Sequence, residues 1–297
     1  MLSPATYGMN LEICFSWLKL LGIFNGPING DDGEQAKREE GLMEIRILGC
    51  YGGELPGYPL CSFAIDKKLL LDAGAVTSVL RLSAQRRISD ILVTHTHLDH
   101  IKDIPFLAAN LVGGQVLRPV NIISTRQIIK SIQTHLFNDA LWPDFTALPS
   151  VDSPVLKFIP VEPGFDLAVD DFMVRAIPVN HAVPAVGYIV RKGRSAILYA
   201  GDTGPTERIW EEANGLEDLK AVIVEISFPN RLGAAAEDSG HMTPRTLKRE
   251  LKKLRRRDIP ILLAHMKPQY LNLLRNEIRQ LGRSHVSFLR PGQRYRF

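Results

Sequence analysis

The chain has 297 residues, of which 45% are hydrophobic and 23% charged, an ordinary composition for a globular protein. Its length allows one large domain or two modest ones, and a core of this size needs no disulfides. The three cysteines, Cys14, Cys50 and Cys61, lack Cys-X-X-Cys spacing and cannot supply a zinc finger, so we interpret them as reduced thiols of a cytoplasmic protein. The net charge of +4 suits an anionic substrate but does not predict a nucleic-acid partner.

Residues 1–42 are expected to form a flexible N-terminal extension. Residues 11–24 are apolar but shorter than the roughly 20 residues that span a bilayer, and Glu12 and Lys19 interrupt them, so no membrane partner is predicted. No basic residue precedes this run and no clear cleavage site follows it, which argues against a signal peptide. The stretch that follows is rich in Gly, Asp and Glu, as in a linker. We therefore place the folded domain over residues 43–297, and Met43 is an alternative start of the protein.

From Met43 onward, short strand patterns alternate with a few helical ones. The strand patterns are apolar or β-branched runs that end at Gly, Asp or His, and they cover residues 44–48, 62–65, 68–71, 88–94, 155–161, 172–179, 186–191, 196–199, 221–226 and 259–264. The helical patterns cover residues 104–111, 127–135, 206–212, 244–257 and 270–281. Many strands with interspersed helices predict a layered α/β sandwich in which sheets pack together and helices cover them.

The densest basic run extends from Lys248 to Arg257. It follows Thr243 and Pro244, which form a good N-cap and first helical turn, and leucines recur within it at helical spacing. We interpret the run as the solvated face of a helix, and contact with phosphate or RNA is the alternative.

Polar residues with metal-binding side chains follow several of the predicted strands. They are Asp72, His95, His181, Asp202 and His265. Strand ends at one edge of a sandwich can converge on a single cleft, so we expect these residues to meet on a rigid scaffold.

The run THTHLDH, from Thr94 to His100, packs three histidines and one aspartate into its last six positions. Imidazole and carboxylate ligands suit zinc, iron or manganese, and the sequence does not choose among these metals. His95 and His97 project to the same side of an extended chain and can reach one ion, whereas Asp99 and His100 follow the turn and can face a second. Two ions roughly 3.5–4 Å apart would clamp a phosphoryl or acyl centre. The alternative, a merely histidine-rich loop, conflicts with a total of only 8 histidines in the chain.

This run resembles the HxHxDH signature of metallo-β-lactamase-fold hydrolases, whose fold is a four-layer αββα sandwich. Asn180-His181, Asp202 in Gly201–Gly204 and His265 in Ala264–Pro268 resemble the later metal-site motifs of that family. The resemblance implies two divalent ions as cofactors, zinc, manganese or iron. It further implies that one ion is held by His95, His97 and His181, that the other is held by Asp99, His100 and His265, and that Asp202 bridges them. Asp72 resembles the supporting aspartate of the family, which orients ligands without binding metal.

The motifs farther along resemble those of class II 3′,5′-cyclic-nucleotide phosphodiesterases. They are HLFNDALWPDF, NHAVPAVGY, YAGDTGPTERIWEE, VEISFPN, SGHMTP and AHMKPQY, and the resemblance runs from about residue 44 to the C-terminus. It implies that residues 43–297 form a catalytic domain that hydrolyses cyclic AMP or cyclic GMP to a nucleoside 5′-monophosphate. A homodimer is compatible with the resemblance, although no feature of the sequence indicates one.

Glu225 and His241 resemble a pair shared with tRNA 3′-processing endonucleases, in which a histidine helped by a glutamate lies beside the leaving group. Expulsion of an alkoxide needs a proton, so a phosphodiesterase has a use for this pair. The alternative is a strand-end acid and a helix-terminal histidine without a catalytic role. The interval from His181 to Asp202 is only 21 positions (202 minus 181), which lacks the long substrate-gripping arm of the tRNA-processing enzymes and favours a small phosphodiester.

The mechanism implied by the resemblance assigns three catalytic residues. Asp99 positions an attacking hydroxide as well as binding metal, and His241, oriented by Glu225, protonates the departing 3′ oxygen. A lactonase or thioesterase would use the same metals without needing the Glu225–His241 pair. A non-catalytic sensor would not be expected to keep a complete ligand set.

The residues that contact the substrate are less well defined. Candidates for contacts with a purine are Asn138, Trp142, Asn180 and Phe228, and candidates for contacts with phosphate are Thr203 and Ser227. For Phe137 and Trp142, ordinary core packing is the favoured interpretation.

Overall fold

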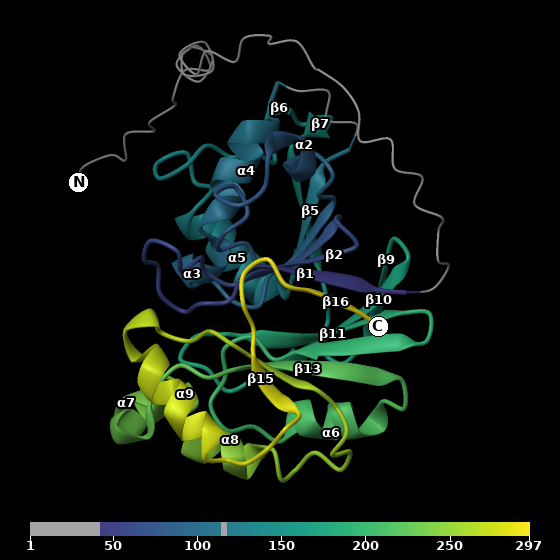
Figure 1. Ribbon diagram of the computed structural model, residues 1–297. Helices are drawn as coiled ribbons and strands as arrows, with labels where there is room; N and C mark the ends of the chain where they lie inside the picture. Colours follow the sequence, from purple (N-terminus) through teal and green to yellow (C-terminus); the bar gives the residue numbers. More distant parts are fainter. Residues whose placement is uncertain (1–41, 114–117) are drawn as a thin grey trace, which may run out of the picture. The chain divides into compact units, whose positions relative to one another are not determined.

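The computed structural model describes residues 42–113 and 118–297, which contain two seven-stranded sheets (Figure 1). The extension expected over residues 1–42 lies outside the described residues except for Leu42. A further two-stranded sheet joins β6 (Pro149–Ser150) to β7 (Ser153–Pro154).

The first large sheet has the strand order β16, β1, β2, β3, β4, β5, β8. Its strands are β16 (Arg294–Arg296), β1 (Glu44–Gly49), β2 (Ser62–Ile65), β3 (Leu69–Leu71), β4 (Asp90–Leu92), β5 (Val120–Ser124) and β8 (Leu156–Pro160). The pairs from β16 to β3 are antiparallel, and those from β3 to β8 are parallel. Strands β2, β3 and β4 are buried at every position, as expected for strands covered on both faces.

The second large sheet has the order β15, β14, β13, β12, β11, β10, β9. Its strands are β15 (Val286–Phe288), β14 (Ile261–Ala264), β13 (Leu219–Glu225), β12 (Ser195–Tyr199), β11 (Val186–Lys192), β10 (Phe172–Pro178) and β9 (Asp166–Val169). The pairs from β15 to β12 are parallel and those from β12 to β9 are antiparallel, so this sheet repeats the layout of the first.

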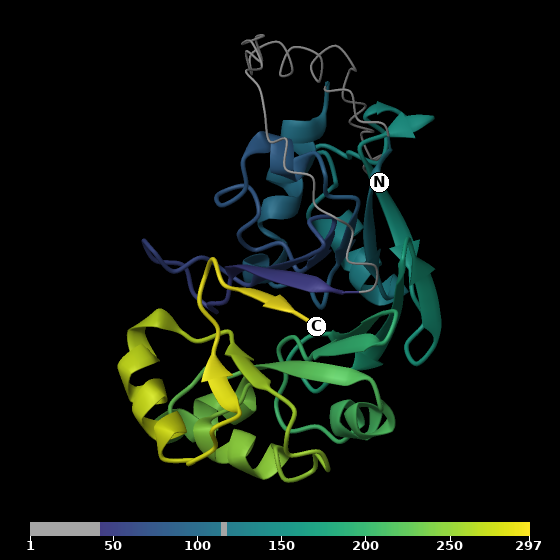
Figure 2. The ribbon, with the colours of Figure 1, turned by 45° about the vertical axis from the view of Figure 1, so that its right-hand side comes forward.

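Helices cover the outer faces of the two sheets (Figures 1 and 2). On the side of the first sheet lie α2 (Leu82–Gln85), α3 (Leu98–Ile101), α4 (Asp103–Leu111) and α5 (Arg126–His135); on the side of the second lie α6 (Arg208–Gly215), η1 (Asn230–Leu232), α7 (Gly233–Asp238), α8 (Pro244–Glu250), η2 (Pro268–Tyr270) and α9 (Leu271–Arg279). Between the sheets, the buried hydroxyl of Tyr188 in β11 lies 2.9 Å from the carbonyl oxygen of Val93, which follows β4. The predicted four-layer αββα sandwich is confirmed.

The helix predicted over residues 244–257 is too long, because α8 ends at Glu250. Beyond this point the basic side chains bind backbone carbonyl groups instead of continuing a helical face. Arg257 donates to the carbonyl oxygen of Leu251 at 3.0 Å, and Arg256 donates at 3.0 Å to a carbonyl oxygen in the loop before β13. These bonds satisfy acceptors that the helix end and the loop would otherwise leave unpaired.

Two of the three cysteines lie in the described part of the chain. Cys50 and Cys61 are buried free thiols, and burial raises the pKa of Cys50 to about 12, which makes it unreactive. Cys14 lies outside the described residues. Over residues 42–113 and 118–297, no helix is long and apolar enough to cross a membrane.

Candidate metal centre

The candidate residues gather at one edge of the sandwich, where strands of both sheets end. Asp72 follows β3, His95 follows β4, His181 follows β10, Asp202 follows β12 and His265 follows β14. The first two strands belong to one sheet and the other three to the second. The structure thus brings these residues together, as the positions of the strand ends predict.

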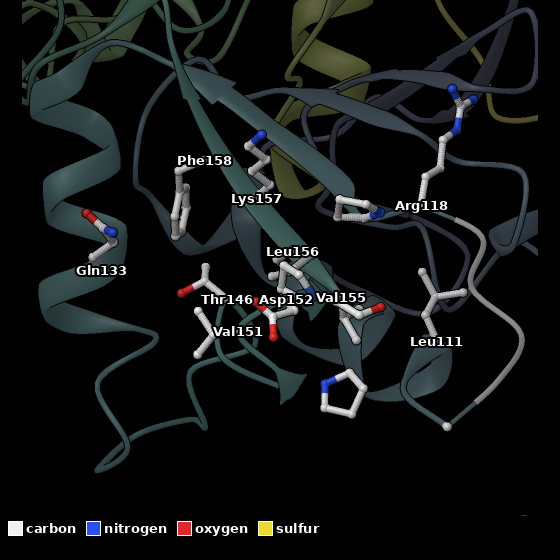
Figure 3. A pocket seen from close by; sticks show the side chains of 15 residues that line it. Leu111, Arg118, Gln133, Thr146, Val151, Asp152, Val155, Leu156, Lys157 and Phe158 are labelled. Atoms are coloured by element: carbon white, nitrogen blue, oxygen red, sulfur yellow. The ribbon is translucent and has the colours of Figure 1, made fainter.

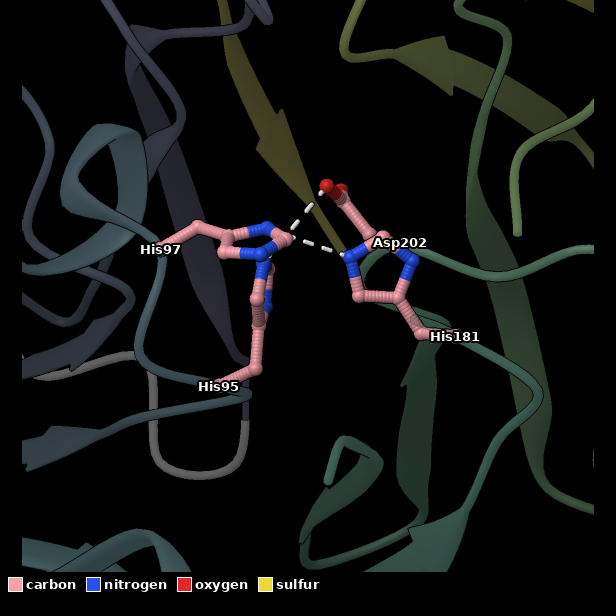
Figure 4. Close-up of side chains that lie close together, drawn as sticks. All are labelled: His95, His97, His181 and Asp202. Carbon is pink, nitrogen blue, oxygen red and sulfur yellow. Dashed lines mark hydrogen bonds and ion pairs between the residues drawn. The ribbon is translucent and has the colours of Figure 1, made fainter. Parts of the chain in front are cut away.

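The first cluster consists of His95, His97, His181 and Asp202, whose ligand atoms all lie within 4.8 Å of one another (Figure 4). Nε2 of His181 is 3.2 Å from Nδ1 of His97, and Nε2 of His95 is 3.7 Å from Oδ2 of Asp202. Three imidazole nitrogens and one carboxylate oxygen at this spacing match the donor set of a transition-metal site.

The second cluster consists of Asp99, His100, Asp202 and His265, again with ligand atoms within 4.8 Å of one another. Nε2 of His265 lies 3.1 Å from an oxygen of Asp99 and 3.1 Å from Oδ2 of Asp202, and Nε2 of His100 lies 3.4 Å from the same Asp202 oxygen. Asp202 therefore belongs to both clusters. A carboxylate in this position can hold two neighbouring ions.

Three buried atoms in these clusters have no hydrogen-bond partner among the described residues: Nε2 of His95, Nε2 of His100 and Oδ1 of Asp202. Buried polar atoms are normally satisfied, so atoms without a partner at the meeting point of several ligands indicate a site for an ion. Burial lowers the pKa of His95 well below its ordinary value, which keeps the ring neutral and its lone pair available. Burial raises the pKa of Asp99, but the hydrogen bond to His265 and the charge of His100 outweigh burial and lower it, so the carboxylate stays ionised. The residues present fit divalent metal ions.

Asp72 lies behind the ligands and holds them in orientation. Its Oδ2 is 2.7 Å from Nδ1 of His100 and accepts a hydrogen bond from the Tyr199 hydroxyl at 2.8 Å. The Thr94 hydroxyl donates to Asp72 at 2.9 Å and lies 3.0 Å from Nδ1 of His95. Because Nδ1 of His95 and of His100 faces these groups, Nε2 of each ring points to the centre. Of these residues, Asp72 is predicted from the sequence, whereas Thr94 and Tyr199 are not.

Ser227 orients the second cluster. Its hydroxyl oxygen is 2.8 Å from Nδ1 of His265, and the hydroxyl donates to Oε2 of Glu225 at 2.7 Å. On the first cluster, Nδ1 of His181 donates to the carbonyl oxygen of Gly240 at 3.0 Å. The Ser227 hydroxyl is thus engaged inside the protein, a position that differs from the phosphate contact expected from the sequence.

The backbone at the centre adopts conformations that few residues accept. Asp72 has φ +55° and His265 has φ +61°, in the left-handed region that costs a non-glycine residue roughly 1 kcal/mol or more. Gly52 packs against the His265 ring so closely that a Cβ atom on it would come within 2.4 Å of that ring. Only glycine fits at this position, a requirement that is not predicted from the sequence.

Glu225 and His241 form a buried pair beside the two clusters. Nδ1 of His241 is 2.7 Å from Oε1 of Glu225, and the His241 ring centroid lies 5.0 Å from that of His181 and 5.3 Å from that of His265. Burial lowers the pKa of His241, but the charge and hydrogen bond of Glu225 outweigh burial and raise it above its ordinary value. Since Glu225 holds Nδ1, the other ring nitrogen is the one that a substrate can reach.

Two of the expected substrate contacts, Asn138 and Trp142, make their contacts away from the clusters. The Asn138 amide donates to the carbonyl oxygen of Thr134 at 2.9 Å, and its Oδ1 accepts from a backbone N–H three residues later at 2.8 Å. Trp142 packs edge-on against Phe106, with ring centroids 5.4 Å apart. Phe137 is 4% exposed, as the favoured core interpretation predicts.

The other three expected contacts lie close to the clusters. The ring centroid of Phe228 is 5.7 Å from that of His241. The Thr203 hydroxyl accepts from the backbone N–H of Asn180 at 3.2 Å and thereby links the loop after β10 to the loop after β12. Asn180 and Thr203 therefore stabilise the two loops that carry His181 and Asp202.

A hollow of about 560 Å³ lies beside the first cluster and is lined in part by His181. Half of its fourteen lining residues are valine or proline, and the polar side chains of Thr125, Arg126, Gln127 and Glu162 line it as well. A hollow of about 660 Å³ between α5, β8 and the β6–β7 hairpin (Figure 3) is a different place, because none of the candidate site residues lines it. Of these two hollows, only the smaller one is lined by a candidate site residue, His181.

The fold and the clustered histidines and aspartates define a class of protein. A family model described as "Beta-lactamase superfamily domain" matches residues 68–266, and the chain belongs to this superfamily. The match contains the residues of both clusters.

Among curated proteins, the chain is similar to a "Probable 3′,5′-cyclic-nucleotide phosphodiesterase" of Yersinia pestis, 24% identical over 209 residues, or 63% of this chain and 59% of that protein. It is also similar to "3′,5′-cyclic-nucleotide phosphodiesterase 1" of Saccharomyces cerevisiae, 29% identical over 233 residues, or 65% of this chain and 62% of that protein. A "Ribonuclease Z" of Ignicoccus hospitalis is 26% identical over 223 residues, 59% of this chain and 70% of that protein. The chain thus spans about 60% of the length of each of these two phosphodiesterases.

Solved structures show the same fold at low sequence identity. Unliganded yeast PDE1 has a TM-score of 0.72 and 21% identity, covering 86% of this chain and 99% of that one. The metallo-β-lactamase fold protein YhfI from Bacillus subtilis has a TM-score of 0.68 and 20% identity, covering 87% of this chain and 100% of that one.

Proposed function

We propose that the protein is a metal-dependent phosphodiesterase that hydrolyses 3′,5′-cyclic nucleotides to nucleoside 5′-monophosphates. The observation that carries this proposal is the Glu225–His241 pair, at 2.7 Å, packed against both ligand clusters. Ester or thioester hydrolysis at the same centre has no need of it. Two relatives named as 3′,5′-cyclic-nucleotide phosphodiesterases support the choice of substrate.

Each group of residues has a distinct role in this proposal. The two clusters would hold two divalent ions, which activate water at neutral pH and neutralise charge on phosphoryl oxygens. Asp99, whose side chain is 28% exposed and so open to the site, positions the attacking water. His241, oriented by Glu225, donates a proton to the 3′ oxygen as its bond to phosphorus breaks, so that no alkoxide is released.

The surroundings of the centre support a small substrate. A hollow of about 560 Å³ is within the range for small-molecule sites, and the valine and proline side chains that line half of it suit the flat face of a base. The chain between His181 and Asp202 is a β11–β12 hairpin, with only Gly193 and Arg194 between its strands. We therefore favour a cyclic nucleotide over tRNA, although ribonuclease Z relatives make RNA processing the second candidate.

The leaving group provides the sharpest test of the His241 role. In metal-loaded enzyme, His241→Ala should lower the turnover of cyclic AMP by about 10²-fold or more, because a ribose alkoxide needs a proton. The same variant should retain most activity on bis(p-nitrophenyl) phosphate, whose leaving group departs without one. His135→Ala, an exposed histidine at the end of α5, serves as the control. An equal loss on both substrates would show that His241 is not the proton donor.

A substrate panel separates the proposed function from its alternatives. Cyclic AMP and cyclic GMP should be hydrolysed to 5′-monophosphates, identified by chromatography, faster than precursor tRNA or a lactone. Exclusive cleavage of precursor tRNA would support the second candidate instead. Turnover of the lactone alone would rule out phosphodiester chemistry at this centre.

A further inference from the structure

A third hollow, of about 950 Å³, lies between α9 and the edge strands β15 and β16, in the yellow C-terminal part of the chain in Figure 1. Four arginines line it, Arg275, Arg279, Arg283 and Arg290, and none of its fourteen lining residues is acidic. We call it the arginine groove. It contains no member of the two clusters, although Met266, which follows His265, is one of its lining residues.

The guanidinium groups of the arginine groove are not used by the rest of the described chain. Among the residues that the structure describes, none of the four arginines forms an ion pair with a carboxylate, and only Arg279 makes a side-chain hydrogen bond, at 3.4 Å to Asn276. Arg256 and Arg257 of the basic run differ, because they bind backbone carbonyls. Four cations in one hollow without acidic partners create a local positive potential that suits an anion with several charges.

Aromatic side chains lie among the arginines. Phe288 of β15 and Tyr295 of β16 both line the groove and are half-buried, so part of each ring faces solvent. Tyr295 is stacked parallel to Phe297, with ring centroids 6.2 Å apart and an interplanar angle of 2°. Guanidinium groups bind phosphate oxygens, and aromatic faces stack on unpaired bases.

From this combination we infer that the arginine groove binds single-stranded nucleic acid. Arg275 and Arg279 are one helical turn apart on α9, a rise of about 6 Å, so they can contact successive phosphates of a strand, and Arg290, which follows β15, offers a further contact from a second segment. A duplex hides its bases from Phe288 and Tyr295, which is why the unpaired form is favoured. The net charge of +4 gave no sign of this surface, since it averages the groove with acidic residues elsewhere.

The inference does not depend on the proposed catalytic function, and binding to the full-length chain tests it without turnover. Fluorescence anisotropy with a labelled RNA of about 10 nucleotides should detect binding that weakens as salt rises. The triple variant R275Q/R279Q/R290Q should weaken binding at least 10-fold. The matched control R81Q/R86Q/R87Q removes three exposed arginines at and beside α2 and should change binding less than about 2-fold. Equal losses in the two variants would overturn the assignment, because they would indicate a general charge effect.

Two further probes separate a nucleic-acid strand from other anions. An abasic oligonucleotide of the same length should bind several-fold more weakly than the RNA. Phe288→Leu should lower the affinity for the intact RNA and leave the affinity for the abasic strand unchanged. Melting curves of each variant confirm that it remains folded. Poly-glutamate at matched charge should compete poorly; if it displaced the RNA fully, the groove would be a site for acidic protein segments. Equal binding of abasic and intact strands would likewise overturn the inference.

Discussion

The two ligand clusters share Asp202 but differ in how firmly their other members are held. His100 and His265 of the second cluster are 0% and 3% exposed, and their Nδ1 atoms lie 2.7 Å from Asp72 and 2.8 Å from Ser227. In the first cluster, His95 is also buried and His181 donates to the Gly240 carbonyl oxygen, but His97 and His181 are only partly buried. In the described chain, the one side-chain hydrogen bond of His97 is its contact with His181.

This difference indicates that the centre consists of a firm site and a soft site. Ligands fixed by outer hydrogen bonds bind metal more tightly, because less conformational freedom is lost when the ion arrives. The second cluster should therefore hold its ion more tightly than the first. The soft site borders the hollow of about 560 Å³, through His181, where a substrate would enter.

Replacing the shared carboxylate should have the largest effect. Asp202→Ala removes a ligand from both clusters, so we expect fewer than one ion per chain and a loss of phosphodiesterase activity of at least ~10³-fold. Elemental analysis and turnover of cyclic AMP measure the two effects, with Asp152→Ala, an exposed position between β6 and β7, as the control. A variant with two bound ions would show that Asp202 does not bridge.

The firm and soft sites should separate on titration with a chelator. In the unmodified protein we expect two ions to leave in two steps. His97→Ala should remove the weaker step and leave about one ion, whereas His100→Ala should remove the tighter one. If both variants lost the same step, the two clusters would not differ in metal affinity as we expect.

The outer hydrogen bonds can be tested one at a time. Ser227→Ala deprives His265 and Glu225 of their common partner, and we expect metal affinity or activity to fall by about 10–100-fold. The loss should fall on the tighter chelation step alone. Ser83→Ala, an exposed serine in α2, should leave both steps unchanged.

The smallest effect is expected far from the centre, at a surface ion cluster. Burial raises the pKa of Asp171, but hydrogen bonds from Lys68 and Lys192 outweigh burial and lower it below its ordinary value of 3.8. Its contribution to stability is therefore full above pH 3.8 and is lost as the pH falls through the lowered pKa. The side chain is 44% exposed, so Asp171→Asn should cost less than about 0.5 kcal/mol at pH 7. Urea unfolding at pH 7 measures the loss, and a series at falling pH below 3.8 should show the difference between the two proteins shrink. A cost above about 0.5 kcal/mol at pH 7 would contradict the prediction.

Much of the fold and the ligand set could be predicted from the sequence, because strands with long apolar runs end at chemically distinctive residues. His95, His97, Asp99 and His100 stand in one short run, so spacing alone pointed to metal. His181, Asp202 and His265 stand alone in the sequence, and only the resemblance to a family assigned them.

The missing parts have physical reasons. Thr94, Tyr199 and Ser227 orient the ligands through single hydroxyls. The sequence around a hydroxyl residue does not reveal whether its side chain has a hydrogen-bond partner in the folded protein. Gly52 lies 213 positions from His265 (265 minus 52), so only the folded chain shows their contact. After the early end of α8, Arg256 and Arg257 donate to backbone carbonyl groups, and such contacts are visible only in the folded chain.

Each ligand cluster draws residues from both sheets: the run from His95 to His100 follows the first, while His181, Asp202 and His265 follow strands of the second. A bound ion would thus cross-link the two sheets of the sandwich. Because the ion binds only the folded protein, its binding free energy would raise the melting temperature. In a cell short of metal, such a protein would lose more than turnover: its halves would separate more often, and proteases would shorten its lifetime.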